Sequence, residues 1–149
     1  MKKYIALAVL LSCTSNLYAE NQWRNQTHFG FSNYIIENLQ GPKLTIACNA
    51  NAGDQYDHSV SFLMNHFEYH NTERQAPLSV LLNQDTLITP PATTTNRSDA
   101  KQWNKFKDAI STATQIDVLL NSHKVASFYP STSSIRTVAI EIKGCEAKE

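Results

Sequence analysis

Residues 116–129 read IDVLLNSHKVASFY, and this stretch decides the fold class of the chain. Two apolar runs, residues 116–120 and 125–129, flank a polar segment of turn-forming residues at 121–124. Strand-like apolar runs separated by such a segment are typical of an antiparallel β-hairpin. The stretch therefore predicts a hairpin and places the chain in a mainly β class.

Segments upstream of this hairpin carry the same kind of signal. Residues 43–48 alternate with a period of two, so Leu44, Ile46 and Cys48 share the apolar face of a half-buried strand. Residues 78–82 are almost continuously apolar and are followed, after a three-residue turn, by residues 86–89. The sequence thus predicts an early strand and a second hairpin.

The segment 135–143 near the C-terminus also alternates. Val138, Ile140 and Ile142 lie on one side of a two-residue period, with polar residues between them. We expect this segment to be the last strand. By the same alternation Cys145 falls on the polar side, and Gly144 before it could supply a bulge that turns the cysteine inward.

One segment, about residues 98–113, has a convincing helical period. Its apolar residues recur at intervals of three, four and three: Trp103, Phe106, Ile110 and Ala113. Asn96 or Ser98 can cap its start. Because an aromatic stripe at this spacing is usually core, we expect it to pack on the sheet rather than to bind a cofactor.

These elements predict a mainly β, β-rich α+β fold. We expect six or seven strands arranged as a single antiparallel sandwich or a strongly curved sheet, with the helix packed on it. A parallel α/β fold is disfavoured, because one helix cannot cover both faces of a parallel sheet.

The first nineteen residues have the features of an export signal. Lys2 and Lys3 precede the apolar run 4–11, and Ala19 is a small residue at the exit. We expect cleavage after Ala19, which would leave residues 20–149 as a single periplasmic or secreted β-rich domain. The alternative is processing at Cys13, which would make the protein an outer-membrane lipoprotein anchored through that residue.

Either way of processing removes or occupies Cys13, so Cys48 and Cys145 remain as a pair. Exported proteins meet an oxidising compartment, where disulfides form and persist. We therefore predict a Cys48–Cys145 disulfide that closes a loop of about a hundred residues and constrains the unfolded chain.

Charge and hydropathy argue against a nucleic-acid partner and against a transmembrane span. Removal of Lys2 and Lys3 leaves 11 basic residues against 13 acidic ones, a formal net charge of −2. Duplex binding needs a concentrated basic face, so we expect no nucleic-acid partner. No segment after the signal approaches the roughly 20 apolar residues of a membrane-spanning helix, so we expect no transmembrane span.

Residues 66–70, His-Phe-Glu-Tyr-His, are the cluster closest to a metal-binding motif. Residues 60–69 alternate with a change of parity, which we interpret as one strand with a register change near residues 63–66. On a strand His66 and His70 would lie roughly 13 Å apart and could not chelate one ion together. We expect His66, Glu68 and His70 to be solvated rather than metal ligands.

No known catalytic motif and no phosphate-binding glycine loop occurs in the chain, and we expect no cofactor. The polar segment after Asn49 predicts a loop, and Tyr56, Asp57 and His58 in it are reasonable contacts for a protein partner. Two loops, residues 51–58 and 90–97, are the candidate binding loops. The sequence favours a small exported, non-catalytic protein that binds a protein of the cell envelope or an incoming protein, as an accessory, inhibitor or immunity-type factor. A small hydrolase or a metal-binding protein without a recognisable motif is the alternative.

Overall fold

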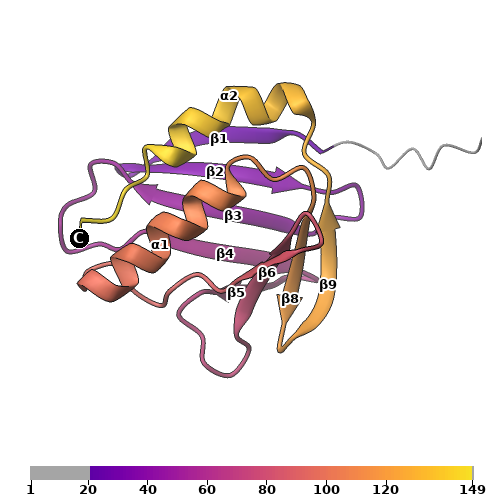
Figure 1. The fold of residues 1–149 in the computed structure, drawn as a ribbon, viewed down its shortest axis with the longest axis horizontal. Coiled ribbons are helices and arrows are strands. Elements are labelled where there is room, and N and C mark those ends of the chain that lie inside the picture. The colour runs from indigo at the N-terminus through magenta and orange to yellow at the C-terminus, as the bar shows by residue number, and fades with distance from the viewer. Residues whose placement is uncertain (1–20, 149) are drawn as a thin grey trace, which may run out of the picture.

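The computed structural model describes residues 21–148. This part of the chain forms nine strands and two helices (Figure 1). The strands are β1 (Trp23–His28), β2 (Phe31–Glu37), β3 (Lys43–Asn49), β4 (Ser59–Met64), β5 (Phe67–His70), β6 (Leu78–Leu82), β7 (Thr86–Ile88), β8 (Ile116–Leu120) and β9 (His123–Phe128). The helices are α1 (Arg97–Ile110) and α2 (Thr132–Lys143).

The first five strands form an antiparallel sheet in which strands consecutive in the chain lie side by side. Short turns make this order possible. Phe29 and Gly30 join β1 to β2 with φ angles of 47° and 83°, and Asn65 and His66 join β4 to β5 with φ angles of 52° and 68°. Positive φ at the central residues matches the right-handed twist of the strands that such turns connect.

The second sheet has the strand order β7-β6-β8-β9, and all its pairings are antiparallel. It contains the two predicted hairpins, β6–β7 and β8–β9, and both predictions are confirmed. α1 lies between β7 and β8 in the chain, so the sheet is completed when β8 pairs with β6 after the helix. In Figure 1, α1 crosses the face of the five-stranded sheet while the second sheet packs at one side of it.

One hydrophobic core joins both sheets and both helices in a sandwich-like packing. The alternation of β3 buries Leu44, Ile46 and Cys48, as predicted. The stripe on α1 is also buried, and Asn96 is its N-cap, since the Asn96 side chain accepts a hydrogen bond from the Asp99 backbone N–H. The predictions of a mainly β fold and of a core-packed helix are therefore confirmed, although the helix ends at Ile110 and Ala113 of the predicted stripe is buried just after it.

The prediction of a last strand at residues 135–143 is wrong, because this segment is most of α2. Its apolar residues suit a helix as well as a strand: Val138 and Ile142 are one turn apart and buried, whereas Ile140 between them is 80% exposed. The Ser131 side chain accepts a hydrogen bond from the Ser134 backbone N–H and caps the helix start. Capping and the i, i+4 spacing decide the outcome.

The structure also adds a strand near the N-terminus and corrects the prediction for residues 60–69. β1 was not predicted, since most of its side chains are polar and exposed. The expected single strand with a register change is two strands, β4 and β5, because the tight turn at Asn65 and His66 reverses the chain. These differences raise the strand count above the expected six or seven.

Candidate functional site

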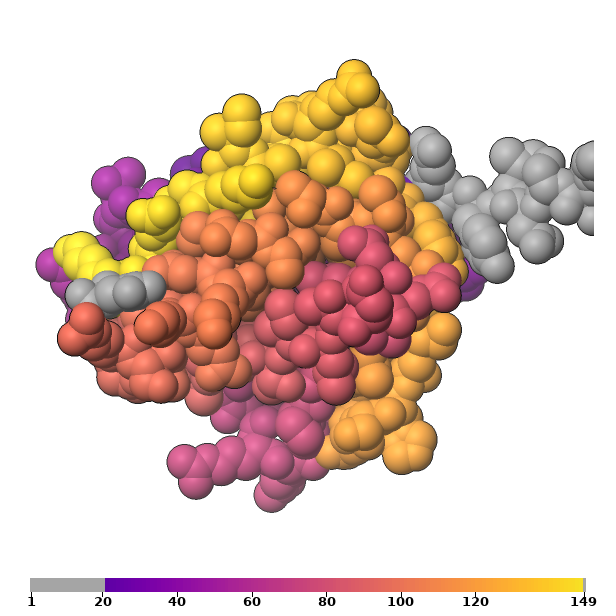
Figure 2. Space-filling model, viewed as in Figure 1, coloured from indigo at the N-terminus to yellow at the C-terminus, as the bar shows by residue number. Residues whose placement is uncertain are grey.

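Four segments that are distant in sequence meet at one end of the molecule. They are the β1–β2 turn, residues 49–58 after β3, residues 90–97 before α1, and residues 144–148 after α2 (Figure 1). We call this region the loop end. Figure 2 shows the C-terminal segment against the start of α1 and the loop after β3.

Backbone contacts hold the first two segments together. The Gly30 carbonyl accepts hydrogen bonds from the backbone N–H groups of Ala50 (3.0 Å) and Asn51 (2.8 Å). A Cβ added at Gly30 would lie 2.6 Å from the Ala52 nitrogen, which real Cβ atoms do not tolerate. Glycine is therefore required here both for its positive φ and for this close approach.

The Asn49 side chain shapes the loop that follows β3. Its Nδ2 donates to the carbonyls of Gly53 (2.7 Å) and Tyr56 (2.8 Å), and its Oδ1 accepts from the Ala52 backbone N–H (2.9 Å). This one side chain thus satisfies three backbone groups. Such local amide–backbone bonds let a loop without regular structure hold one conformation.

The two loops predicted to bind a partner are bonded to each other through Asp57. Its Oδ1 accepts hydrogen bonds from the Thr94 backbone N–H (2.7 Å) and from the hydroxyls of Thr94 and Thr93 (both 3.0 Å). The His58 backbone N–H donates to Thr94 Oγ1 (3.1 Å). Residues 51–58 and 90–97 therefore form a single unit, because a charged acceptor with three donors resists separation.

The predicted disulfide is confirmed: Cys48 and Cys145 are bonded with an S–S distance of 2.00 Å. Both residues are buried. Cys145 comes after Gly144, the C-cap of α2, so it does not lie on a strand and needs no bulge to turn it inward. The bond links β3 to the C-terminal segment over a sequence separation of 97 residues.

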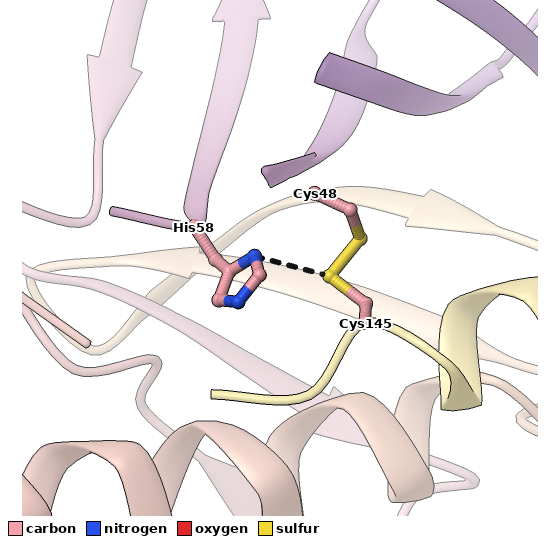
Figure 3. A group of neighbouring side chains, drawn as sticks. All are labelled: Cys48, His58 and Cys145. Carbon is pink, nitrogen blue, oxygen red and sulfur yellow. Dashed lines mark hydrogen bonds between the residues drawn. A yellow bond between two sulfur atoms is a disulfide. The ribbon is translucent and has the colours of Figure 1, made fainter. Parts of the chain in front are cut away.

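His58 lies against this disulfide and is only 8% exposed (Figure 3). Its Nδ1 is 3.4 Å from Cys145 Sγ and accepts a hydrogen bond from the Asn49 backbone N–H (3.0 Å). Its Nε2 is 3.1 Å from the Glu146 carbonyl oxygen, to which it donates. The ring therefore has its proton on Nε2, because Nδ1 faces a donor and Nε2 faces an acceptor.

Burial lowers the pKa of His58 below its ordinary value, because the charged ring would lose its hydration. The hydrogen bond to the Glu146 carbonyl and the nearby Asp57 carboxylate oppose this shift. The ring also stacks on Trp103, with centroids 5.2 Å apart and planes 9° from parallel. These contacts hold a neutral imidazole in one orientation.

The C-terminal segment is bound along α1. Trp103 Nε1 donates to the Cys145 carbonyl (2.8 Å), and the Asn104 amide makes two bonds with the Ala147 backbone, of 3.0 and 3.1 Å. Lys107 is buried, and its ammonium donates to the Lys143 carbonyl at the end of α2 (2.6 Å). A cation at this position stabilises the exposed carbonyls of a helix C-terminus.

These segments enclose an open pocket of about 480 Å³, lined mainly by polar groups. Its lining comes from the loop after β3, from residues 94–95 and from residues 146–148. Tyr56 lines the pocket and is 53% exposed. Its ring lies edge-on to the Phe31 ring, with the two ring centroids 6.1 Å apart. Phe29, on the neighbouring turn, is 85% exposed.

The three residues predicted to contact a partner lie in different environments. Tyr56 presents its ring to solvent at the pocket, Asp57 is half-buried and bonded to residues 93–94, and His58 is buried. The sequence interpretation missed the contact of His58 with the disulfide. The pairing of Ala47 with Ser59 in β3 and β4, extended by one residue, places Cys48 opposite His58, and no pattern in the sequence indicated this register.

The other histidine cluster lies on the hairpin at the far end of β4. His66 is in the turn, and on β5 the Nε2 atom of His70 is 3.9 Å from Oε2 of Glu68. Within residues 21–148, one group of three metal-ligating side chains has its ligand atoms within 4.8 Å of one another, and it comprises Cys48, His58 and Cys145. That the hairpin histidines bind no metal stays a prediction.

Neither α1 nor α2 is long and apolar enough to cross a bilayer, and this holds for every helix in residues 21–148. The predicted export signal, residues 1–19 with Cys13, lies outside the described residues.

Comparison with known proteins assigns the chain to a family. No curated protein and no solved structure gives a significant match. The YfjT family model matches residues 21–139, which run from just before β1 into the second half of α2. Because this match spans most of the chain, the protein belongs to the YfjT family.

Proposed function

We propose that this chain is an exported, non-catalytic protein that binds another protein of the cell envelope, or an incoming protein, through its loop end. The observation that carries the proposal is the placement of Phe29 and Tyr56, which are 85% and 53% exposed on adjoining, hydrogen-bonded loops. Large exposed aromatic side chains contribute most of the energy in many protein interfaces.

The rigidity of the loop end supports binding. Asn49 holds the loop after β3, Asp57 bonds it to residues 93–94, and the disulfide anchors the C-terminal segment beside it. A loop that is already ordered loses little conformational entropy when a partner docks on it, which raises the affinity for a given set of contacts.

Export is part of this proposal. It is supported by the signal-like residues 1–19 and by the buried disulfide, since disulfides are typical of oxidising compartments. Replacement of Cys13 by Ser in cells labelled with a fatty-acid analogue separates the two forms. We expect no label in either protein; label that disappears in Cys13→Ser would establish the lipoprotein instead.

A non-catalytic role is favoured over a small hydrolase by the state of His58. Both ring nitrogens are hydrogen-bonded to backbone groups, and the ring is packed between the disulfide and Trp103. A general base must reach a nucleophile or a substrate proton. The sulfur that His58 approaches is bonded to a second sulfur, so it is no nucleophile in this state.

The test is a pull-down from envelope extract with three forms of the mature protein. We expect the wild type to recover one partner in a stoichiometric amount and the Phe29→Ala/Tyr56→Ala double variant to lose it. Leu87→Ala is the matched control, because Leu87 is a large apolar residue 62% exposed on the second sheet. Circular dichroism checks that all three forms are folded.

Retention of the partner by the double variant would show that the loop end is not the interface. Absence of any partner, together with turnover of a cell-wall or peptide substrate by the purified protein, would replace the binding proposal by the hydrolase alternative.

A further inference from the structure

The contact between His58 and the disulfide has the geometry of a metal site whose two sulfur ligands are oxidised. Sγ of Cys48, Sγ of Cys145 and a nitrogen of His58 lie within 4.8 Å of one another (Figure 3). They come from β3, from the segment after α2 and from the residue before β4. Two cysteines and one histidine are a common ligand set for zinc in proteins.

We propose that reduction of the Cys48–Cys145 disulfide converts this cluster into a binding site for a thiophilic d¹⁰ metal ion, with zinc as the reference ion. Both thiolates and His58 Nδ1 are the ligands. This site goes beyond protein recognition at the loop end and does not depend on it.

The distances fit tetrahedral zinc. Zn–S bonds of about 2.3 Å and Zn–N bonds of about 2.0–2.1 Å put neighbouring ligand atoms roughly 3.5–3.8 Å apart. His58 Nδ1 already lies 3.4 Å from Cys145 Sγ. The two sulfur atoms, bonded at 2.00 Å, have to separate after reduction, and side-chain rotation suffices because the two Cα atoms are 5.5 Å apart.

The surroundings orient His58 as a metal-ligating histidine is usually oriented. Such a histidine donates its second ring N–H to a carboxylate or a backbone carbonyl, which directs the other nitrogen at the metal. Here Nε2 donates to the Glu146 carbonyl, and Nδ1 faces the sulfur atoms. Trp103 supports both partners, because it stacks on the ring and donates to the Cys145 carbonyl.

One hydrogen bond has to give way. The Asn49 backbone N–H donates to Nδ1 in the disulfide form, so the metal replaces this donor at the ring nitrogen. His58 and Glu146 both line the pocket, so a water molecule from the pocket can supply the fourth ligand. Three protein ligands and one open position describe the proposed site.

The redox step balances with a dithiol as the reductant. The protein disulfide takes two electrons from the dithiol, which closes its own disulfide, and Zn²⁺ then binds the two protein thiolates with release of two protons. A small-molecule disulfide accepts two electrons from the thiolates and, with two protons, leaves as two thiols, which restores the Cys48–Cys145 bond and releases the metal. Metal binding and the disulfide are therefore mutually exclusive.

Zinc binding to the mature protein, purified without an affinity tag, tests this proposal. One sample stays oxidised; the other is reduced with dithiothreitol and desalted without oxygen, and both are dialysed against zinc. We expect one zinc per reduced chain by elemental analysis and none per oxidised chain. Cobalt(II) in place of zinc should give the intense visible bands of tetrahedral, thiolate-ligated cobalt in the reduced sample alone.

Variants separate this site from adventitious binding by thiols. His58→Ala should weaken zinc binding at least tenfold, whereas His70→Ala, which removes a half-buried histidine on the hairpin, should leave it unchanged. Circular dichroism follows folding, and zinc-induced recovery of structure in reduced protein counts as binding. Reduced wild-type protein that binds no zinc, or His58→Ala with wild-type affinity, overturns the proposal.

Discussion

The two ends of β4 carry similar residues and have opposite environments. At its start, Asp57 and His58 are packed against residues 93–94, the disulfide and Trp103. At the end of β4, a two-residue turn at Asn65 and His66 leads into β5, where Glu68 and His70 lie on the solvent side of the hairpin. A histidine beside an acidic residue is found at both ends.

This difference shows that the environment of the histidines at either end of β4 depends on which distant segments of the chain pack against them. At the start of β4, His58 contacts Cys145 of the C-terminal segment and stacks on Trp103 of α1. At the other end of β4, the hairpin leads into β5, which is an edge strand and pairs only with β4 in the five-stranded sheet. Burial and contact with the disulfide give His58 a structural role, whereas His66 is exposed and His70 is half-buried at the edge of the sheet.

Among changes that test the difference between the two ends of β4, loss of the disulfide should lower the stability of the protein most. Cys48→Ala should lower the free energy of unfolding by about 2–5 kcal/mol, because a loop of this length strongly restricts the unfolded chain. Urea denaturation under non-reducing conditions measures it. The native protein should show no free thiols among residues 20–149 by mass spectrometry, and two free thiols in envelope-derived material would refute the disulfide.

Replacement of the His58 ring should have the next largest effect. His58→Ala leaves the Asn49 N–H and the Glu146 carbonyl without their partner and opens a cavity beside Trp103. We expect the lost hydrogen bonds and the cavity to lower the free energy of unfolding by about 2–4 kcal/mol. The matched variant His70→Ala should change stability by about 0.5 kcal/mol or less, because the His70 side chain is 45% exposed on the hairpin. Equal losses at both positions would remove the contrast between the two ends.

Charging the His58 ring should have a smaller effect than removing it. Its pKa is lowered in the folded protein by burial, so between that pKa and the ordinary value near 6.5 the unfolded chain binds more protons. Stability is therefore fully present above about pH 6.5 and falls as the pH drops toward the lowered pKa. Denaturation of oxidised protein at several pH values should show this fall, and His58→Gln should reduce it. An unchanged pH profile in His58→Gln would contradict the assignment.

The smallest effect is expected at the turn of the hairpin. His66 has a φ of 68°, a conformation that glycine adopts without the steric cost of a Cβ. His66→Gly produces the Asn-Gly pair preferred in two-residue hairpins and should raise stability by a few tenths of a kcal/mol to about 1 kcal/mol. Thermal denaturation checks this, and a clear loss of stability would show that the His66 side chain makes a contact of its own.

Much of the local structure followed from the sequence alone. The period-two burial of β3, the hairpins β6–β7 and β8–β9, and the capped stripe of α1 were all predicted, because each depends on residues close in the chain. The segment 135–143 shows the limit. Val138, Ile140 and Ile142 satisfy a strand period, but Ser131 caps a helix whose i, i+4 pair Val138 and Ile142 is buried, and Ile140 is left in solvent.

The sequence by itself determined the mainly β class, the core-packed helix and, once export was inferred, the Cys48–Cys145 pair, since that pair followed from which cysteines remain. Only the tertiary structure decided that Asp57 joins two loops, that Phe29 stands beside Tyr56's loop, and that His58 faces Cys145. Each of these contacts joins residues that no local period relates, because their distance is set by how the sheets, the helices and the C-terminal segment pack.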